Sequence, residues 1–184
     1  MDSLVTMATR EGVAIITINN PPVNALSHGV PEGLETAIHA ANADPGVHAI
    51  VVIGGGRTFV AGADINELEK AAYGQAELPD LHPALNMIEA SPKPVVMAIH
   101  GTALGGGLEL AMAGHYRVAA AGSQLGLPET KLGIIPGAGG TQRLPRLVGT
   151  AKAAEMCATG DPIPARDALA AGLVDRVITA GKRT

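Results

Sequence analysis

The segment at residues 95–113 restricts the fold more than any other part of the chain, because it joins an apolar run, three glycines and a run of helix formers. The run Val95–Ile99 predicts a buried strand, since it is bounded by Pro94 and Gly101. After the glycines at 105–107, the sequence LELAMA has no β-branched residue and predicts a helix. A strand, a glycine turn and a helix start leave backbone N–H groups free at the helix N-terminus, where they can bind an anionic group.

Two glutamates lie in and after this segment. Glu109 falls in the first turn of the predicted helix, where the helix dipole stabilises a carboxylate. Glu129 follows Leu-Pro and has apolar neighbours on both sides, which predicts a raised pKa through desolvation. Two carboxylates beside free N–H donors suit acid–base chemistry next to a developing oxyanion. Solvated or helix-capping glutamates are the more common use of such residues, so spacing alone leaves both interpretations open.

The remaining pattern alternates strands with helices and predicts an α/β core. Strands are expected at 3–9, 13–18 and within 48–56, and a short one after Gly172. Helices are expected at 31–43, from about 65, at 82–90, at 143–159 with a break at Pro145, and at 165–171. Residues 70–83 are polar and interrupted by glycine and proline, which predicts a mobile segment. The length of 184 residues predicts one domain, residues 1–184.

Composition excludes several classes of partner. The formal net charge of −4 leaves no basic footprint, so nucleic acid is not expected to bind. No window of eighteen residues is continuously apolar, and the N-terminus lacks a basic region followed by an apolar one, so neither a membrane span nor a secretory signal is expected. The expected location is therefore cytoplasmic. The single cysteine, Cys157, excludes a disulfide within the chain and is expected to be a small buried thiol.

The glycine clusters do not match the known nucleotide motifs. Gly101 and Gly106 have the spacing of a P-loop, but Gly107 and Leu108 stand where lysine and serine or threonine are required. The cluster after residue 136 fails the dinucleotide fingerprint, because Gln142 occupies the place of its last glycine.

Other catalytic constellations are also missing. The sequence has no Gly-x-Ser-x-Gly elbow. Its six histidines form no His-x-x-x-His or Glu-x-x-His pair, so no metal site is expected. His100 and His115 flank the glycine turn and are expected to be structural, because neither has a nucleophile or acid partner nearby in sequence.

Three blocks carry a family resemblance. FVAGADINEL at 59–68, GTALGGGLELAMAGHYRVA at 101–119 and LGLPETKLGIIPGAGGTQRLPRLVG at 125–149 resemble the enoyl-CoA hydratase/isomerase (crotonase) superfamily. They are most similar to the N-terminal hydratase part of multifunctional fatty-acid oxidation proteins. The resemblance implies the ClpP/crotonase fold of repeated β-β-α units, forming two sheets flanked by helices. It also implies that a C-terminal helical segment of the family is missing here, and that the protein is a homo-oligomer, a trimer or a hexamer.

The resemblance assigns site residues. It implies that the N–H groups of Ala63 and Gly106 hold the thioester oxygen, with Glu109 and Glu129 as the acid–base pair. The further residues implied to bind acyl-CoA are Ala61, Gly62, Asp64, Ile65, Gly105, Pro128 and Gly137. Asn24 also matches a position common in the family. No metal and no cofactor are implied, since coenzyme A is part of the substrate.

The implied activity is that of an enoyl-CoA hydratase, which adds water reversibly to a trans-2-enoyl-CoA in fatty-acid β-oxidation. Glutamate at both positions favours hydration, because family members that only shift a double bond generally keep one acid–base residue. Two alternatives stay open: a Δ3–Δ2-enoyl-CoA isomerase, and a truncated, non-catalytic module that binds acyl-CoA.

Overall fold

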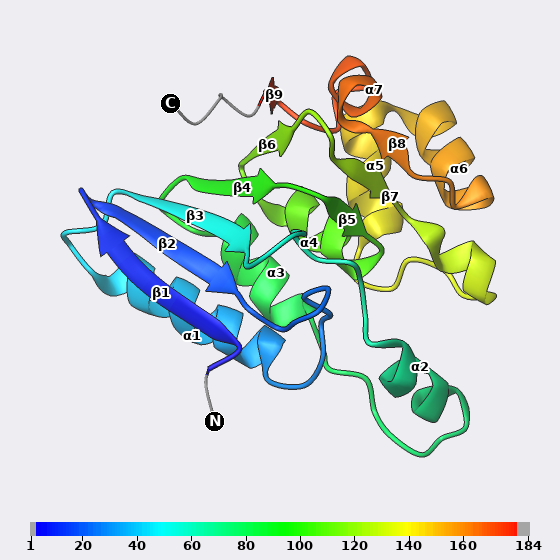
Figure 1. Cartoon of the computed structure of the whole chain (residues 1–184), viewed down its shortest axis with the longest axis horizontal. Coiled ribbons are helices and arrows are strands. Elements are labelled where there is room, and N and C mark those ends of the chain that lie inside the picture. The colour runs from blue at the N-terminus through cyan, green and yellow to red at the C-terminus, as the bar shows by residue number, and fades with distance from the viewer. Residues whose placement is uncertain (1–2, 180–184) are drawn as a thin grey trace.

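Alternating apolar residues build a six-stranded sheet in the computed structural model, which describes residues 3–179 (Figure 1). Residues 1–2 and 180–184 of the predicted domain lie outside the described residues. The strand order is β1-β2-β3-β4-β6-β9; β1 and β2 form an antiparallel hairpin and the other neighbours are parallel. The strands are β1 (Val5–Arg10), β2 (Val13–Ile18), β3 (Ala49–Gly54), β4 (Val95–Ile99), β6 (Tyr116–Ala120) and β9 (Arg176–Ile178).

A second sheet has three short strands, in the order β5-β7-β8. They are β5 (Thr102–Leu104), β7 (Gln124–Gly126) and β8 (Ile163–Pro164). β5 follows β4 after the turn at Gly101, and an isolated parallel bridge joins Val60 to Ala103 of β5. This bridge brings the loop after β3 to the edge of the small sheet, next to the glycine turn.

The helices cover one face of the large sheet and the end that carries the small one (Figure 1). They are α1 (Val30–Ala43), α2 (Ile65–Ala72), α3 (His82–Glu89), α4 (Gly106–Ala113), α5 (Gly140–Val148), α6 (Thr150–Thr159) and α7 (Ala165–Ala170), with one 3₁₀ helix, η1 (Pro128–Leu132). α1 buries its apolar stripe against β1 and β2, as its 3.6-residue periodicity predicts. The helix α4 is buried all round, so its N-terminus is fixed in the centre of the molecule.

The predicted helix 143–159 ends correctly at Thr159, but its start and its break are wrong. The helix α5 begins at Gly140 and contains Pro145, and the chain breaks instead at Gly149, which has φ +79°. Proline removes one N–H donor from a helix, whereas a positive φ cannot be continued as a right-handed helix. The N–H of Gly149 still donates to the carbonyl of Pro145, and α6 starts at the next residue. The other predicted elements lie within a few residues of the observed ones.

Candidate active site

A cavity of about 890 Å³ lies where α4, η1, the loop after β3 and the segment before α3 meet. Its wall is mostly apolar and contains three carboxylates, the buried Glu109 and Glu129 and the exposed Asp80. Ten of the eleven site residues expected from the sequence line this one cavity: Ala61, Gly62, Ala63, Ile65, Gly105, Gly106, Glu109, Pro128, Glu129 and Gly137. Segments separated by more than sixty positions in the sequence therefore meet at one place, although the roles of these residues stay predictions.

The glycine turn allows the backbone to approach closely at the cavity floor. Gly105 has φ +53°, and a Cβ on it would come within 3.2 Å of the Oε1 atom of Glu129. A Cβ on Gly107 would overlap the carbonyl oxygen of Val60. The N–H of Leu104 donates to that same carbonyl at 3.1 Å. Only glycine therefore lets α4 start against the loop at 60–63.

The backbone N–H groups of Ala63 and Gly106 have no backbone acceptor among residues 3–179, and the same holds for their neighbours Gly62 and Gly107. Gly106 is the first residue of α4, so its N–H has no acceptor within the helix. Ala63 precedes α2 and lies outside any helix or strand. Both residues line the cavity and neither side chain is large, so a ligand oxygen could approach both N–H groups.

Asp64 is the one expected site residue outside the cavity lining. Its Oδ1 atom accepts hydrogen bonds from the N–H groups of Asn66 at 2.8 Å and Glu67 at 3.3 Å. The carboxylate therefore caps α2, as a residue of this type does at a helix N-terminus. Its side chain is used for structure, and only its backbone remains for a ligand.

Glu109 is a buried carboxylate with strong donors. It is 2% exposed, and its Oε1 atom accepts hydrogen bonds from the N–H groups of Ala138 at 2.8 Å and Gly140 at 2.7 Å. Burial raises the pKa of Glu109, whereas the two N–H bonds and the positive charges of His82 and Arg143 lower it. Desolvation is the larger cause, so the pKa of Glu109 is raised overall, and the donors limit this rise by stabilising the ionised form.

Glu129 is buried without such donors. It is 7% exposed, and its Oε2 atom has no hydrogen-bond partner among the described residues. Burial, the larger cause, and the charge of Glu109 together raise its pKa to about 7. The direction and the cause, desolvation, agree with the sequence, and the preceding Leu127 is buried as expected, but three of the apolar neighbours expected to shield Glu129 are exposed. These neighbours are Leu132, Ile134 and Ile135.

Unequal surroundings separate the two carboxyl groups chemically. Glu109 is the group whose ionised form receives hydrogen bonds, and Glu129, whose pKa is raised to about 7, is the group that keeps its proton below neutral pH. A base and an acid in one cavity, next to two free N–H donors, are the parts needed to add or remove a proton beside a carbonyl.

The sequence did not indicate a second pair on the wall. His82, at the start of α3, has its Nδ1 atom 2.9 Å from Oδ1 of Asp80, and both residues line the cavity. They fall in the segment 70–83, whose composition predicted only a mobile connection. Asp80 also accepts a hydrogen bond from the N–H of His82, which is an ordinary role for an Asp at a helix start, so no sequence signal distinguished the pair.

The expected structural residues lie near the site. The Nδ1 atom of His115 accepts from the N–H of Val95 at 3.0 Å, which fixes β4 against the start of β6. Cys157 is half-buried, and burial raises the pKa of its thiol. Among residues 3–179 there is no group of three or more His, Cys, Asp or Glu side chains that could hold a metal ion. No helix in that range is long and apolar enough to cross a membrane.

Comparison with known proteins decides the family. The description "Enoyl-CoA hydratase/isomerase" matches residues 8–182. The chain belongs to the enoyl-CoA hydratase/isomerase family. It is 51% identical over 173 residues to the probable enoyl-CoA hydratase of Bacillus subtilis (strain 168), covering 92% of this chain and 67% of that protein. It is 50% identical over 168 residues to the peroxisomal bifunctional enzyme of Danio rerio, covering 91% of this chain but only 23% of that protein.

Solved structures give the same family and the crotonase fold. DspI of Pseudomonas aeruginosa superposes with a TM-score of 0.88 at 34% identity, covering 98% of this chain and 70% of that one. The enoyl-CoA hydratase of Bacillus anthracis superposes with a TM-score of 0.85 at 37% identity, covering 96% of this chain and 70% of that one. This member of the family thus spans about two thirds of the single hydratases and about a quarter of the multifunctional proteins that it matches.

Proposed function

We propose that this chain is an enoyl-CoA hydratase, which adds water reversibly to a trans-2-enoyl-CoA and forms a 3-hydroxyacyl-CoA, as in fatty-acid β-oxidation. One observation supports this proposal most strongly: two buried carboxylates with different surroundings share a cavity with two free N–H donors. The similarity to proteins named as hydratases supports it as well.

The free N–H groups would bind the thioester oxygen. When water attacks C3 of a conjugated thioester, negative charge develops on that oxygen as an enolate forms. The N–H groups of Ala63 and Gly106 would stabilise this charge, and each such donor contributes roughly 3–4 kcal/mol to a transition state. Small residues at both positions let the thioester approach the backbone.

The two glutamates would move the protons. Ionised Glu109 takes a proton from the water whose oxygen bonds to C3. Protonated Glu129 orients that water and gives its own proton to C2, which converts the enolate into the 3-hydroxyacyl thioester. Each turnover leaves Glu109 protonated and Glu129 ionised, so a proton returns from one to the other through solvent. Coenzyme A enters only as part of the substrate.

Loss of the enoyl absorbance of crotonyl-CoA tests the proposal. We expect turnover with the native chain, and losses of about 10²- to 10⁴-fold in both Glu109→Gln and Glu129→Gln, because each removes one proton-transfer step. Glu155→Gln, an exposed glutamate of α6, is the matched control and should retain full activity. Rates should fall above a pH of about 7, where Glu129 loses its proton.

Two other outcomes identify the alternatives. Turnover of a 3-enoyl-CoA that needs Glu129 but not Glu109 would show an isomerase. Binding of the thioester without any turnover would show a non-catalytic acyl-CoA module. Either result would contradict the hydratase proposal.

A further inference from the structure

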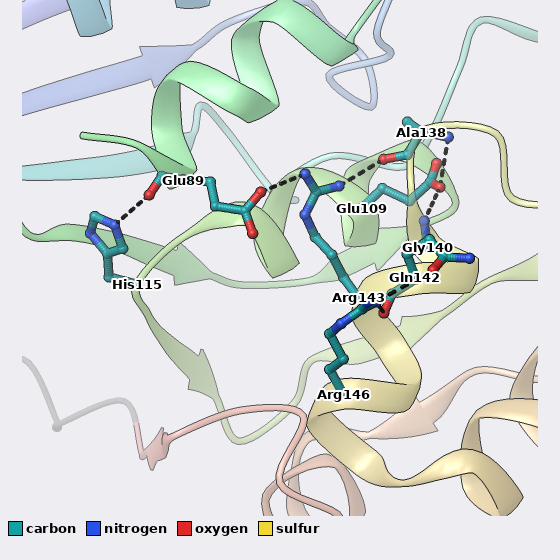
Figure 2. Close-up of polar contacts among 8 residues, drawn as sticks. All are labelled: Glu89, Glu109, His115, Ala138, Gly140, Gln142, Arg143 and Arg146. Atoms are coloured by element: carbon teal, nitrogen blue, oxygen red, sulfur yellow. Dashed lines mark hydrogen bonds and ion pairs between the residues drawn. The ribbon is translucent and has the colours of Figure 1, made fainter.

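Arg143 connects the loop that holds Glu109 to the end of α3 (Figure 2). Its Nη1 atom donates to the carbonyl of Ala138 at 3.1 Å, and its Nη2 atom donates to Oε2 of Glu89 at 2.8 Å. The N–H of the same Ala138 donates to Oε1 of Glu109. Ala138 is thus the one residue that links the guanidinium of Arg143 to the carboxylate of Glu109 through hydrogen bonds.

Glu89 is itself anchored to the large sheet (Figure 2). The Nδ1 atom of His115 accepts from the N–H of Val95, so the neutral imidazole carries its proton on Nε2. That Nε2 atom donates to the carbonyl of Glu89 at 3.2 Å. The hydrogen bonds therefore run from β4 through α3 to Arg143, and from there to the loop at 136–140.

The guanidinium is held in place by packing as well as by hydrogen bonds. The side chain of Arg143 is only 15% exposed, and its buried Nε atom has no partner among the described residues. Gly139 lies directly against it, since a Cβ at this position would overlap Nη1. Burying the guanidinium charge and leaving its Nε–H unpaired both cost free energy. The hydrogen bonds to Ala138 and Glu89 must offset this cost.

We infer that Arg143 is a positioning residue for Glu109. Its guanidinium fixes the loop at 136–140, so that the N–H groups of Ala138 and Gly140 stay directed at Oε1 of the carboxylate. The inference rests on the proposed role of Glu109 as the base. Space is tight there: a Cβ on Gly140 would come within 2.9 Å of Oε1, so a small shift of the loop changes both hydrogen bonds.

Several charged or titratable groups face Glu109 from the elements around it: Glu129 of η1, His82 of α3, Cys157 of α6 and Arg143 of α5. Removing Arg143 withdraws a positive charge and loosens two N–H donors. Both changes favour the protonated form of Glu109. The acid limb of the pH–rate profile, where the base becomes protonated, should therefore move to higher pH.

The first experiment compares Arg143→Met with Arg146→Met on crotonyl-CoA. Arg146 lies three residues further along α5, is exposed, and contacts only Gln142 in the network of Figure 2. We expect Arg143→Met to lower kcat by up to about 100-fold, the size of effect that a small misplacement of a catalytic group produces. Its acid limb should move upward, while Arg146→Met retains the native profile. A native rate and profile in Arg143→Met would overturn the inference.

Glu89→Ala separates position from charge. This variant keeps the positive charge beside Glu109 but releases its anchor, and it also removes a negative charge. Positioning predicts a lower kcat and an acid limb at higher pH. An unchanged kcat, with the acid limb of the pH–rate profile unchanged or at lower pH, would show that Arg143 acts only through its charge. That result would contradict the inference.

Amide hydrogen exchange gives a readout that does not depend on turnover. The N–H groups of Ala138 and Gly140 should be protected in the native chain and in Arg146→Met, and should exchange at least about tenfold faster in Arg143→Met, because the loop that carries them is no longer held against Glu109. If Arg143→Met does not fold, Arg143→Lys replaces it, since a lysine cannot bridge both acceptors. Native protection in a folded Arg143 variant would overturn the inference. Protection that depends on Arg143, in a chain without hydratase turnover, would refute the proposed function and leave the positioning intact.

Discussion

Glu109 and Glu129 are chemically identical side chains that the fold makes different. Glu109 receives two N–H donors from the loop at 136–140, whereas Glu129 has an oxygen without a partner among the described residues. Hydrogen bonds stabilise the ionised form of the first, and desolvation favours the protonated form of the second. An acid and a base therefore arise from one residue type.

The raised pKa of Glu129 makes a prediction about stability. In the unfolded chain this carboxyl loses its proton near 4.5, and in the folded chain near 7. Between these values the unfolded state binds fewer protons than the native state, so the free energy of unfolding falls as pH rises. The loss is at most about 3 kcal/mol for a shift of this size.

Urea unfolding from pH 4.5 to pH 8 checks this prediction. Glu129→Gln cannot ionise, so its stability relative to the native chain should increase across this range and level off above pH 7. Glu155→Gln should follow the native chain at every pH, because Glu155 is exposed. A constant difference between Glu129→Gln and the native chain would refute the assignment.

Asn24 joins two loops beside the site. It is 2% exposed, and its Nδ2 atom donates to the carbonyls of Gly55, Thr58 and Phe59. Its φ of +54° lies in the left-handed region, which Asn adopts more readily than most residues. Asn24, which the sequence marked only as a position common in the family, therefore has a structural role: it holds its own loop against residues 55–59.

We expect Asn24→Ala to lower the free energy of unfolding by about 3 kcal/mol, because it leaves buried carbonyls unpaired and places alanine at a positive φ. Asn24→Gly removes the same hydrogen bonds but tolerates the backbone, so it should be about 1 kcal/mol more stable than Asn24→Ala. Denaturant titration measures both. Equal stabilities of the two variants would show that the positive φ is not a source of strain.

At the scale of elements, the junction between β5 and α4 determines where the site forms. The three glycines let α4 begin against the loop at 60–63, and this contact places two free N–H groups on one wall. The helix is buried all round, so it cannot move aside to relieve a clash.

Gly107→Ala should therefore be severely destabilising, by about 3 kcal/mol, because its Cβ would overlap the carbonyl of Val60. Any folded fraction should bind acyl-CoA weakly, since the helix start and the loop at 60–63 are forced apart. Gly122→Ala is the control: no atom lies within 4 Å of its added Cβ. Thermal unfolding of both variants is the measurement, and a native melting temperature for Gly107→Ala would contradict the packing argument.

At the scale of the whole molecule, the large sheet has one covered and one open face. Figure 1 shows α1, α3 and α4 behind β1–β4, and the alternate side chains that point the other way are half-buried. The strand register places Ile15, Val51 and Val96 side by side on this open face. Parallel sheets are normally covered on both faces, so a second copy of the chain is expected to cover this one.

Val51→Lys tests that expectation, because it places a charge at the centre of the open face. Sedimentation velocity over a range of concentrations should show association of the native chain and a shift toward monomer in Val51→Lys. Thr36→Lys, on the exposed side of α1, adds the same charge elsewhere and should associate like the native chain. A native chain that stays monomeric would refute the predicted homo-oligomer.

The sequence alone determined those features that depend on residues close together in the chain, namely most secondary-structure elements and the family motifs. Apolar patterns located β1, β2, β3, β4 and β9 and most helices within a few residues, but not the strands β5 to β8, and the three blocks identified the family. It misplaced the break in the helix at 143–159, because the chain breaks at Gly149, whose φ of +79° glycine adopts readily, and not at Pro145.

Only the tertiary structure decided how the site functions. The N–H partners of Glu109, the unpartnered oxygen of Glu129 and the contact of Arg143 with Ala138 join segments far apart in the chain. Of the apolar residues near Glu129 in sequence, Leu127 is buried, whereas Leu132, Ile134 and Ile135 are exposed, and Gly105 from another element lies against its carboxylate. The pKa of a carboxyl group depends on all atoms within a few ångströms of it. It is therefore set by the folded surroundings rather than by the residues adjacent in sequence.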